Sequence, residues 1–220
     1  MSPLDRFLDP SHLSLKVCGV TRPADADMLV ALGVDAVGVN FWPGSKRYLA
    51  PEAAAWLVPL AGKILRVGVF VNAPAELPLR LVRDGLIDVV QLHGDESPAD
   101  AAFLRRNGIP FIKAIGVQSP ADLDAAHEFG AAAILLDAHA PGIYGGTGRT
   151  MDWHMASAFR TAHPQLPLIL AGGIVPENAA AAAAAVHPAA LDTASGVESA
   201  PGIKDPHKIQ SLLHALSPTP

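Results

Sequence analysis

The sequence predicts a single-domain (β/α)8 TIM barrel of the α/β class, and three observations support this fold. Eight short runs of β-branched and other apolar residues alternate along the chain with alanine- and leucine-rich helical patterns. The runs are apolar throughout, which is typical of parallel strands covered by helices. No linker rich in Pro, Gly or Ser divides the 220 residues. Eight strand–helix units in about 200 residues fit the small end of the barrel range.

The predicted elements follow one another as strand and then helix. We expect strands at Ser14–Val17, Ala36–Asn40, Leu65–Val71, Val89–Leu92, Phe111–Ala114, Ala132–Leu136, Leu168–Leu170 and Ala190–Leu191. We expect helices at Pro23–Leu32, Pro51–Leu60, Ala75–Asp84, Pro98–Asn107, Ala121–Phe129, Trp153–Ala162, Pro176–Val186 and Asp205–Leu216. Residues 1–12, which Pro3 and Pro10 punctuate, predict a loose leader before a barrel domain of residues 13–220.

Local signals support the helix boundaries. Ser97-Pro98 and Ser119-Pro120 each supply a cap residue followed by a proline near the first helical position. Several helices are followed by a glycine suited to a left-handed C-terminal cap, namely Gly33, Gly85, Gly108 and Gly130. An open doubly wound sheet is the competing architecture, but no GxGxxG motif follows the first strand.

Composition and charge argue against several classes of protein. The net charge is −5, and acidic and basic residues are scattered along the chain without a basic stripe, so we expect no nucleic-acid partner. The apolar runs are far shorter than a membrane span. The nine histidines show neither HxH nor HExxH spacing, so no metal site is predicted. The single cysteine excludes an internal disulfide, and no secretory signal is visible, so we expect a cytoplasmic protein.

In a barrel, functional groups lie at the carboxyl ends of the strands and in the loops that follow them. These positions hold a polar set: Cys18, Asn40, Arg47, Asn72, His93, Asp137, Gly172, Gly173, Asp192, Ser195 and Gly196. The longest connection, His139 to Met151, contains four glycines and suits a mobile lid or a close backbone approach to a ligand.

Two turns after the last strands predict a phosphate site. Gly172-Gly173 follows the seventh strand and Ser195-Gly196 follows the eighth, where phosphate sites of barrels frequently lie. Backbone amides free of side-chain bulk can close around an oxyanion, and a helix N-terminus adds its dipole. The alternative is a pair of ordinary glycine turns, but their occurrence after both expected strands favours phosphate.

Two strand-end residues are candidate catalysts. Burial at the barrel mouth would favour the neutral form of the Asp137 carboxyl, which suits a general acid, although an isolated aspartate is more often a cap or turn residue. Cys18 taken alone resembles a buried small hydrophobe. Its position at the same mouth favours a base or nucleophile, provided that a nearby positive charge lowers its pKa.

Two further residues have open alternatives. Arg47, in Ser45-Lys46-Arg47-Tyr48, can grip a planar carboxylate in bidentate fashion, or it can belong to a solvated basic turn. His93 is either a ligand contact or a satisfied polar group at a strand end, and the sequence favours neither.

Taken together, the motifs from Lys16 to Leu216 resemble those of the phosphoribosylanthranilate isomerase family. The resemblance is carried by eight blocks in order: KVCGVT (16–21), DAVGVNFWPGSKRYLAPE (35–52), RVGVFVN (66–72), VVQLHGDE (89–96), ILLDA (134–138), YGGTGRTMDW (144–153), LILAGGIVPENA (168–179) and LDTASGVESAPGIKD (191–205).

The resemblance implies an Amadori rearrangement of a phosphorylated ribosylamine that carries anthranilate, with no cofactor. It implies Cys18 as the general base, Asp137 as the general acid and Arg47 as the group that binds the anthranilate carboxylate. Asp192 is expected to contact the substrate. Phosphate binding is expected at Gly172, Gly173, Ser195 and Gly196. Many family members have serine where Ala194 stands, so one side-chain contact to phosphate is absent here.

Two rival functions remain. A dual-substrate sugar isomerase of histidine and tryptophan biosynthesis would have an aspartate where Cys18 stands. A non-catalytic phosphosugar-binding barrel would need neither Cys18 nor Asp137. The resemblance leaves the oligomeric state open between monomer and homodimer.

Overall fold

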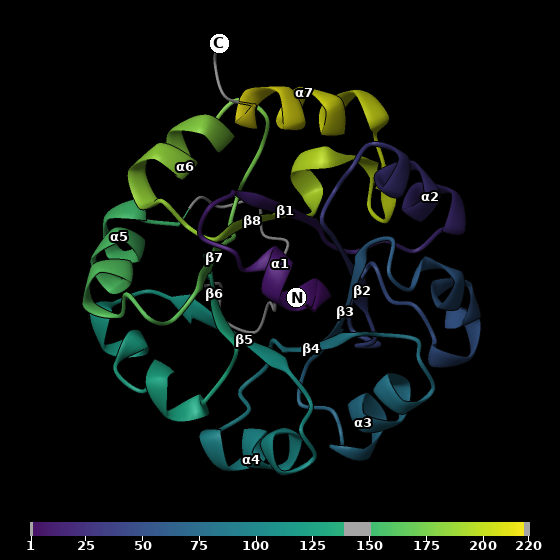
Figure 1. Ribbon diagram of the computed structural model, residues 1–220, viewed down its shortest axis with the longest axis horizontal. Helices are drawn as coiled ribbons and strands as arrows, with labels where there is room; N and C mark the ends of the chain where they lie inside the picture. The colour runs from purple at the N-terminus through teal and green to yellow at the C-terminus, as the bar shows by residue number, and fades with distance from the viewer. Residues whose placement is uncertain (1, 139–150, 218–220) are drawn as a thin grey trace.

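The computed structural model describes residues 2–138 and 151–217, and these contain a closed barrel of eight parallel strands (Figure 1). The strands pair in chain order, and β8 pairs with β1 to close the barrel. They are β1 (Ser14–Val17), β2 (Ala36–Asn40), β3 (Leu65–Phe70), β4 (Val89–Leu92), β5 (Phe111–Val117), β6 (Ala133–Ala138), β7 (Leu168–Leu170) and β8 (Ala190–Thr193). The predicted (β/α)8 fold is therefore confirmed, although β5, β6 and β8 extend beyond their predicted carboxyl ends.

Helical segments surround the barrel as an outer ring (Figure 1). They are α2 (Pro23–Ala31), η1 (Pro51–Leu60), α3 (Glu76–Arg83), α4 (Pro98–Arg106), η2 (Pro120–Leu123), η3 (Ala126–Phe129), α5 (Trp153–Ala162), α6 (Ala179–Val186) and α7 (Pro206–Leu216). After β8 come the short η4 (Ser195–Val197) and the hairpin of β9 (Glu198–Ala200) and β10 (Ile203–Lys204). Within the described residues, no helix has the length and apolar character needed to cross a membrane.

Two segments that the sequence assigned to helices are 3-10 helices. The predicted helix Ala121–Phe129 is wrong in detail, since it divides into η2 and η3, whose buried residues Leu123, Ala126 and Phe129 lie three positions apart. The predicted helix Pro51–Leu60 is likewise a 3-10 helix, η1, and it buries Ala54, Leu57 and Leu60. A spacing of three places side chains directly above one another at three residues per turn, so both segments fit the tighter helix.

Alternation along the strands separates two apolar layers. Leu15 and Val17 of β1 belong to the large core between the strands and the outer helices. A second cluster fills the barrel interior near the amino-terminal ends of the strands, and includes Ala36, Leu65 and Ile112. Because successive side chains alternate in direction, Ser14 and Lys16 of β1 face inward. The same parity directs Asp137 of β6 and Asp192 of β8 into the interior.

The amino-terminal segment is more ordered than the predicted loose leader. Residues Pro3–Phe7 form the helix α1, which Ser2 and Asp5 start with a reciprocal capping box. Phe7 is 2% exposed and packs into the interior cluster with Leu4 and Leu8 beside it. Helix α1 therefore covers the amino-terminal end of the barrel, at the centre of Figure 1. The prediction was wrong because it relied on the prolines of this segment, whereas its three apolar residues pack together against the barrel interior.

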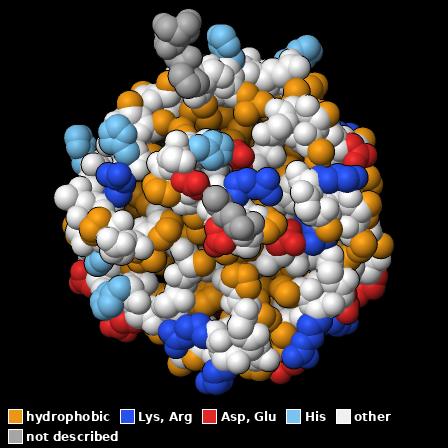
Figure 2. Space-filling view, in the orientation of Figure 1, with side chains coloured by type: hydrophobic (Ala, Val, Ile, Leu, Met, Phe, Trp, Pro, Cys, Tyr) orange, Lys and Arg blue, Asp and Glu red, His pale blue; other side chains and the backbone are white. Residues whose placement is uncertain are grey.

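The outer face of α1 is polar. Asp5 and Arg6 are exposed, and the space-filling view of this end of the barrel shows acidic and basic side chains around its centre (Figure 2). The helix thus presents its charges to solvent and its apolar side chains to the barrel interior.

We predict that Phe7→Ala lowers the free energy of unfolding by about 3 kcal/mol, because it empties a buried aromatic site at the barrel base. Urea denaturation followed by circular dichroism measures the change. Arg6→Ala, on the exposed side of the same helix, is the control and is expected to change stability by less than about 0.5 kcal/mol. Equal midpoints for Phe7→Ala and the unchanged protein would show that α1 does not contribute to stability.

Candidate active site

The carboxyl ends of the strands bring four of the predicted site residues together. His93, one residue after β4, places Nε2 3.5 Å from Oδ2 of Asp137 on β6. Burial raises the pKa of Asp192 on β8, Lys16 opposes this rise, and the charges of Asp137 and His93 act on it in opposite directions. Asp192 in turn raises the pKa of the Cys18 thiol, which follows β1. The predicted convergence of these side chains on one mouth is therefore observed.

Lys16 lies beneath this group in a buried ion pair. Lys16 is opposite Asp192 in the β1–β8 pairing, and its Nζ donates to Asp192 Oδ1 at 2.9 Å. The Lys16 side chain is 0% exposed. Burial alone would lower the pKa of Lys16, but the Asp192 carboxylate, together with the charge that Cys18 carries once it is a thiolate, outweighs burial and raises it. Lys16 is therefore a permanent cation next to the thiol.

The neighbouring strand leaves space for these groups. A side chain at Gly38 of β2 would lie 2.7 Å from Sγ of Cys18 and 3.0 Å from Nζ of Lys16. A Cβ essentially never approaches other atoms this closely, so the absence of a side chain at position 38 admits both the thiol and the ammonium group.

The pKa of Cys18 is raised, so the lowered pKa that a catalytic thiolate would require is not found in this state. Burial is the main cause, and the nearby Asp192 carboxylate adds to it. Lys16 and Lys204 act in the opposite direction, because their positive charges favour the thiolate, but they do not overcome burial. Cationic neighbours, which the sequence could not identify, are thus present, although in this state the thiol form of Cys18 is favoured at neutral pH.

A hydrogen-bonded chain holds the Asp137 side chain. Asp137 Oδ1 accepts from the backbone N–H of Ala138 at 2.8 Å, while Oδ2 faces His93. The Gln91 amide group lies 2.8 Å from His93 Nδ1. With the amide nitrogen donating to Nδ1, the proton of a neutral His93 ring is on Nε2 and points toward Asp137. His93 thus has polar partners within the chain itself, beside Asp137 at the mouth, and its contact to a ligand stays a prediction.

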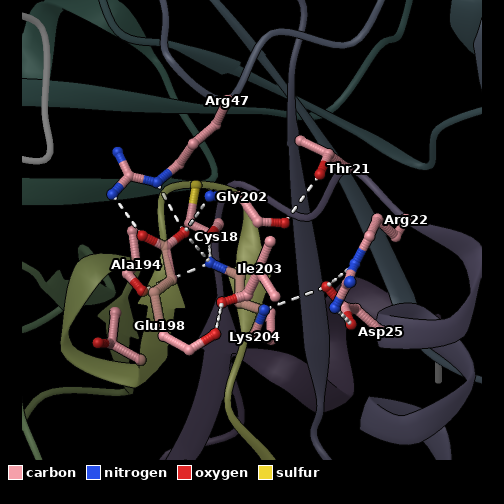
Figure 3. A network of polar contacts seen from close by, with 12 residues as sticks. Cys18, Thr21, Arg22, Asp25, Arg47, Ala194, Glu198, Gly202, Ile203 and Lys204 are labelled. Carbon is pink, nitrogen blue, oxygen red and sulfur yellow. Dashed lines mark hydrogen bonds and ion pairs between the residues drawn. The ribbon is translucent and has the colours of Figure 1, made fainter.

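Arg47 reaches the mouth from the loop after β2 and is paired with a carboxylate of the chain itself (Figure 3). Its Nε and Nη2 donate to the two oxygens of Glu198 at 2.8 and 2.6 Å. Glu198 also accepts from Nζ of Lys204 at 2.7 Å. Arg47 itself is therefore not a solvated residue, since its side chain is only 14% exposed, whereas Lys46 of the same turn is exposed.

The two turns predicted to bind phosphate lie against each other. Gly172 and Gly173 both have positive φ, 81° and 67°, a region that favours glycine. Gly196 packs directly on the Ile174 carbonyl, with no space for a side chain. Thr193 Oγ1 donates to that same carbonyl at 2.7 Å. Ser195 and Gly196 begin η4, so backbone of both turns meets at the ends of β7 and β8.

Several residues of the site were not predicted from the sequence as contributors. Gln91, Glu198 and Lys204 are buried polar side chains in the networks above. The signal for Lys16 is its spacing of two from Cys18, which places both on one face of a strand. The four glycines for which a lid or a close backbone approach to a ligand was predicted fall within residues 139–150, outside the described residues. Among the residues that are described, no group of three His, Cys, Asp or Glu side chains is arranged to hold a metal ion.

The closed fold and the cluster of ionisable groups at its carboxyl-terminal mouth define a (β/α)8-barrel enzyme. A sequence model of the family described as N-(5'phosphoribosyl)anthranilate (PRA) isomerase matches residues 15–215. The chain therefore belongs to the PRA isomerase family, and it is an isomerase of tryptophan biosynthesis.

Individual relatives agree with this assignment. The chain is 43% identical over 204 residues to the N-(5'-phosphoribosyl)anthranilate isomerase of Syntrophus aciditrophicus (strain SB), covering 92% of this chain and 86% of the relative. The crystal structure of phosphoribosyl anthranilate isomerase from Thermus thermophilus matches with a TM-score of 0.82 at 41% identity, covering 93% of this chain and 98% of that one. A further isomerase structure is a complex with reduced 1-(o-carboxyphenylamino)-1-deoxyribulose 5-phosphate. It matches with a TM-score of 0.80 at 36% identity over 93% of this chain and 98% of that one.

We predict that the alkylation rate of Cys18 by iodoacetamide rises with pH around a midpoint above the ~8.5 of an ordinary thiol. Asp192→Asn removes a charge that raises this pKa, so its midpoint is lower. Lys16→Met removes a charge that lowers it, so its midpoint is higher. The single cysteine makes alkylation a direct measure.

Asp88→Asn, remote from the thiol, controls for general loosening of the fold. A wild-type midpoint below that of an ordinary thiol, or shifts of the same sign in the two site variants, would contradict the electrostatic origin of the raised pKa.

Proposed function

We propose that the chain converts N-(5-phosphoribosyl)anthranilate to 1-(2-carboxyphenylamino)-1-deoxyribulose 5-phosphate, with Asp137 as general acid and Cys18 as general base. The order of groups around the mouth is the observation that carries the proposal. Asp137 is on β6 and Cys18 follows β1, and between these strands lie β7 and β8 with the two glycine-containing turns. A phosphate bound at those turns would leave the sugar between the acid and the base.

The proposed chemistry needs two proton transfers. Asp137 gives a proton to the ring oxygen of the ribose, the bond from that oxygen to C1 breaks, and a positively charged Schiff base forms at C1. Cys18 then removes the proton on C2, and the electron pair of that bond forms a C1–C2 double bond. The C=N electron pair returns to nitrogen, which gives a neutral enolamine. The enolamine becomes the ketone as a proton is added at C1 and the C2 hydroxyl group loses its proton. Electrons move only within the substrate, so the reaction requires no external oxidant or reductant.

The environment of each group supports its role. The Schiff base brings a positive charge next to Cys18, and this charge favours the thiolate, as Lys16 and Lys204 already do. After Asp137 has given up its proton, the Nε2–H of His93 can stabilise the carboxylate that remains. The substrate's charge thus assists ionisation of a thiol that burial keeps protonated in this structure.

The remaining groups bind the ends of the substrate in this proposal. Phosphate would be held by backbone amides of the turns at Gly172-Gly173 and Ser195-Gly196, without a side chain from Ala194. The anthranilate carboxylate would be held by Arg47. Asp192, fixed by Lys16, would accept from a sugar hydroxyl group.

We further propose a cytoplasmic protein that acts as a monomer or homodimer, without nucleic-acid or membrane partners. Size-exclusion chromatography with light scattering distinguishes monomer from homodimer.

We predict that Cys18→Ser and Asp137→Asn each lower kcat by about 10²- to 10⁴-fold, the range that general acid–base groups contribute. The fluorescence of the anthranilate substrate follows turnover directly. Both substitutions keep size and shape, so the loss is in proton transfer rather than in folding.

Inhibition by inorganic phosphate controls for substrate binding, and its inhibition constant is expected to stay within about twofold in both variants. Near-normal kcat in either variant would remove that residue from its proposed role. Titration of the substrate without turnover by the unchanged protein would instead indicate a non-catalytic binding barrel.

A further inference from the structure

Glu198 has no role in the proton transfers, yet it is one of the most highly connected side chains of the mouth (Figure 3). It is 7% exposed and accepts from Arg47, from Nζ of Lys204 and from the backbone N–H of Gly202. Burial would raise the pKa of Glu198, but its bonds to Arg47 and Lys204 outweigh burial and lower it. Glu198 is therefore a fixed carboxylate at neutral pH.

The pairing uses only one edge of the Arg47 guanidinium group. Glu198 engages Nε and Nη2. A guanidinium group has five N–H donors in a planar fork, so one N–H of Nη2 and both of Nη1 remain. Among the described residues, Nη1 has no hydrogen-bond partner. The edge formed by Nη1 and Nη2 can therefore accept a second carboxylate in bidentate fashion while Glu198 stays bound.

The backbone at Gly19 restricts where Arg47 can lie. Gly19 has a φ of +73°, and a side chain there would overlap Cδ of Arg47. The aliphatic part of Arg47 thus crosses the chain immediately after Cys18. With its stem against Gly19 and its inner edge on Glu198, the guanidinium plane has one orientation.

The charges of the network also balance in favour of an anionic ligand. Lys204 Nζ bonds to Glu198 Oε1 at 2.7 Å and to the Cys18 carbonyl oxygen at 2.6 Å. Burial lowers the pKa of Lys204, and its bond to Glu198 opposes this fall. With Arg47 and Lys204 protonated and Glu198 ionised, one net positive charge remains for one carboxylate. Without Lys204, Glu198 would cancel the charge that Arg47 offers to a ligand.

We propose that Glu198 is a positioning residue that holds the inner edge of Arg47, so that the outer edge receives the aryl carboxylate of the substrate. The inference rests on the proposed function of Arg47. It adds that Glu198 and its counter-ion Lys204, which do not touch the ligand, contribute to selectivity for a carboxylate-bearing ligand by orienting Arg47.

The test compares two ligands by isothermal titration calorimetry. One is reduced 1-(o-carboxyphenylamino)-1-deoxyribulose 5-phosphate, and the other is the same compound with a phenyl ring that lacks the carboxylate. Glu198→Gln is expected to weaken binding of the first about tenfold, as loss of a charged hydrogen bond does, and to leave the second within about twofold. In turnover assays, KM rises about tenfold while kcat changes by less than about threefold.

A matched control is available within the chain. Arg66 and Asp88 form another bidentate pair, with Nε and Nη2 of Arg66 at 2.9 and 2.6 Å from the Asp88 oxygens. Arg66 also donates to the backbone carbonyls of Leu57 and Gly85, away from the mouth. Asp88→Asn is expected to reduce stability and to leave the affinity ratio of the two ligands unchanged.

A third variant separates failure of this proposal from failure of the proposed function. Arg47→Ala is expected to abolish the preference for the carboxylate-bearing ligand. If Arg47→Ala keeps that preference, the carboxylate role of Arg47 is wrong. If Arg47→Ala loses the preference and Glu198→Gln keeps it, only the positioning role of Glu198 is overturned. Should Glu198→Gln fail to fold, Glu198→Asp keeps the charge on a shorter side chain, and an unchanged affinity ratio in it would overturn the proposal equally.

Discussion

The buried ion pair between Lys16 and Asp192 is the interaction on which the rest of the mouth depends. It spans the seam where β8 meets β1, and so it lies at the point where the barrel closes. Two buried charges are tolerated only as partners, and removal of one from such a pair typically costs about 3–5 kcal/mol. The pair therefore fixes the seam, and it also sets two opposing charges beside the Cys18 thiol.

The consequences of this pair extend around the mouth as a series of alternating charges. Asp192 raises and Lys16 lowers the pKa of Cys18, while Lys204 bonds to the Cys18 carbonyl and to Glu198, which in turn binds Arg47. Within this series, which does not include Asp137, the three cations Lys16, Lys204 and Arg47 outnumber the carboxylates of Asp192 and Glu198 by one. A site arranged in this way is held rigid by its internal bonds and still attracts an anion.

Most of the fold could be predicted from the sequence because each strand and each helix end is marked by residues within the element itself or next to it. Runs such as Val89–Leu92 are apolar and short, and glycines such as Gly33 and Gly85 mark where helices end. Helix α1 was missed although Leu4, Phe7 and Leu8 have helical spacing, because a five-residue helix gains its stability from the barrel it covers and not from its own sequence.

The site could be predicted only in part, and the division has a physical cause. Cys18 and Asp137 end apolar runs, so the sequence places them at the mouth. The contact between Arg47 and Glu198 joins residues 151 positions apart, and no local pattern encodes such a pair. The direction of the Lys16 side chain could not be assigned either. Alternate residues of a strand face opposite sides, and only the packing of the two apolar clusters shows which side is the barrel interior.

The raised pKa of Cys18 bears on how a thiol can serve as a base at this mouth. A permanently ionised cysteine would be open to oxidation and alkylation whenever the mouth is accessible. Burial keeps Cys18 in its thiol form, while Lys16 and Lys204 bring the thiolate within reach of one further positive charge. In the proposed reaction, that charge appears on the substrate only after ring opening. The base would then ionise at the step that uses it. Burial protects the thiol before that step, and the two lysines lower the cost of ionising it when the step occurs, so the two opposing effects on the pKa serve the same reaction.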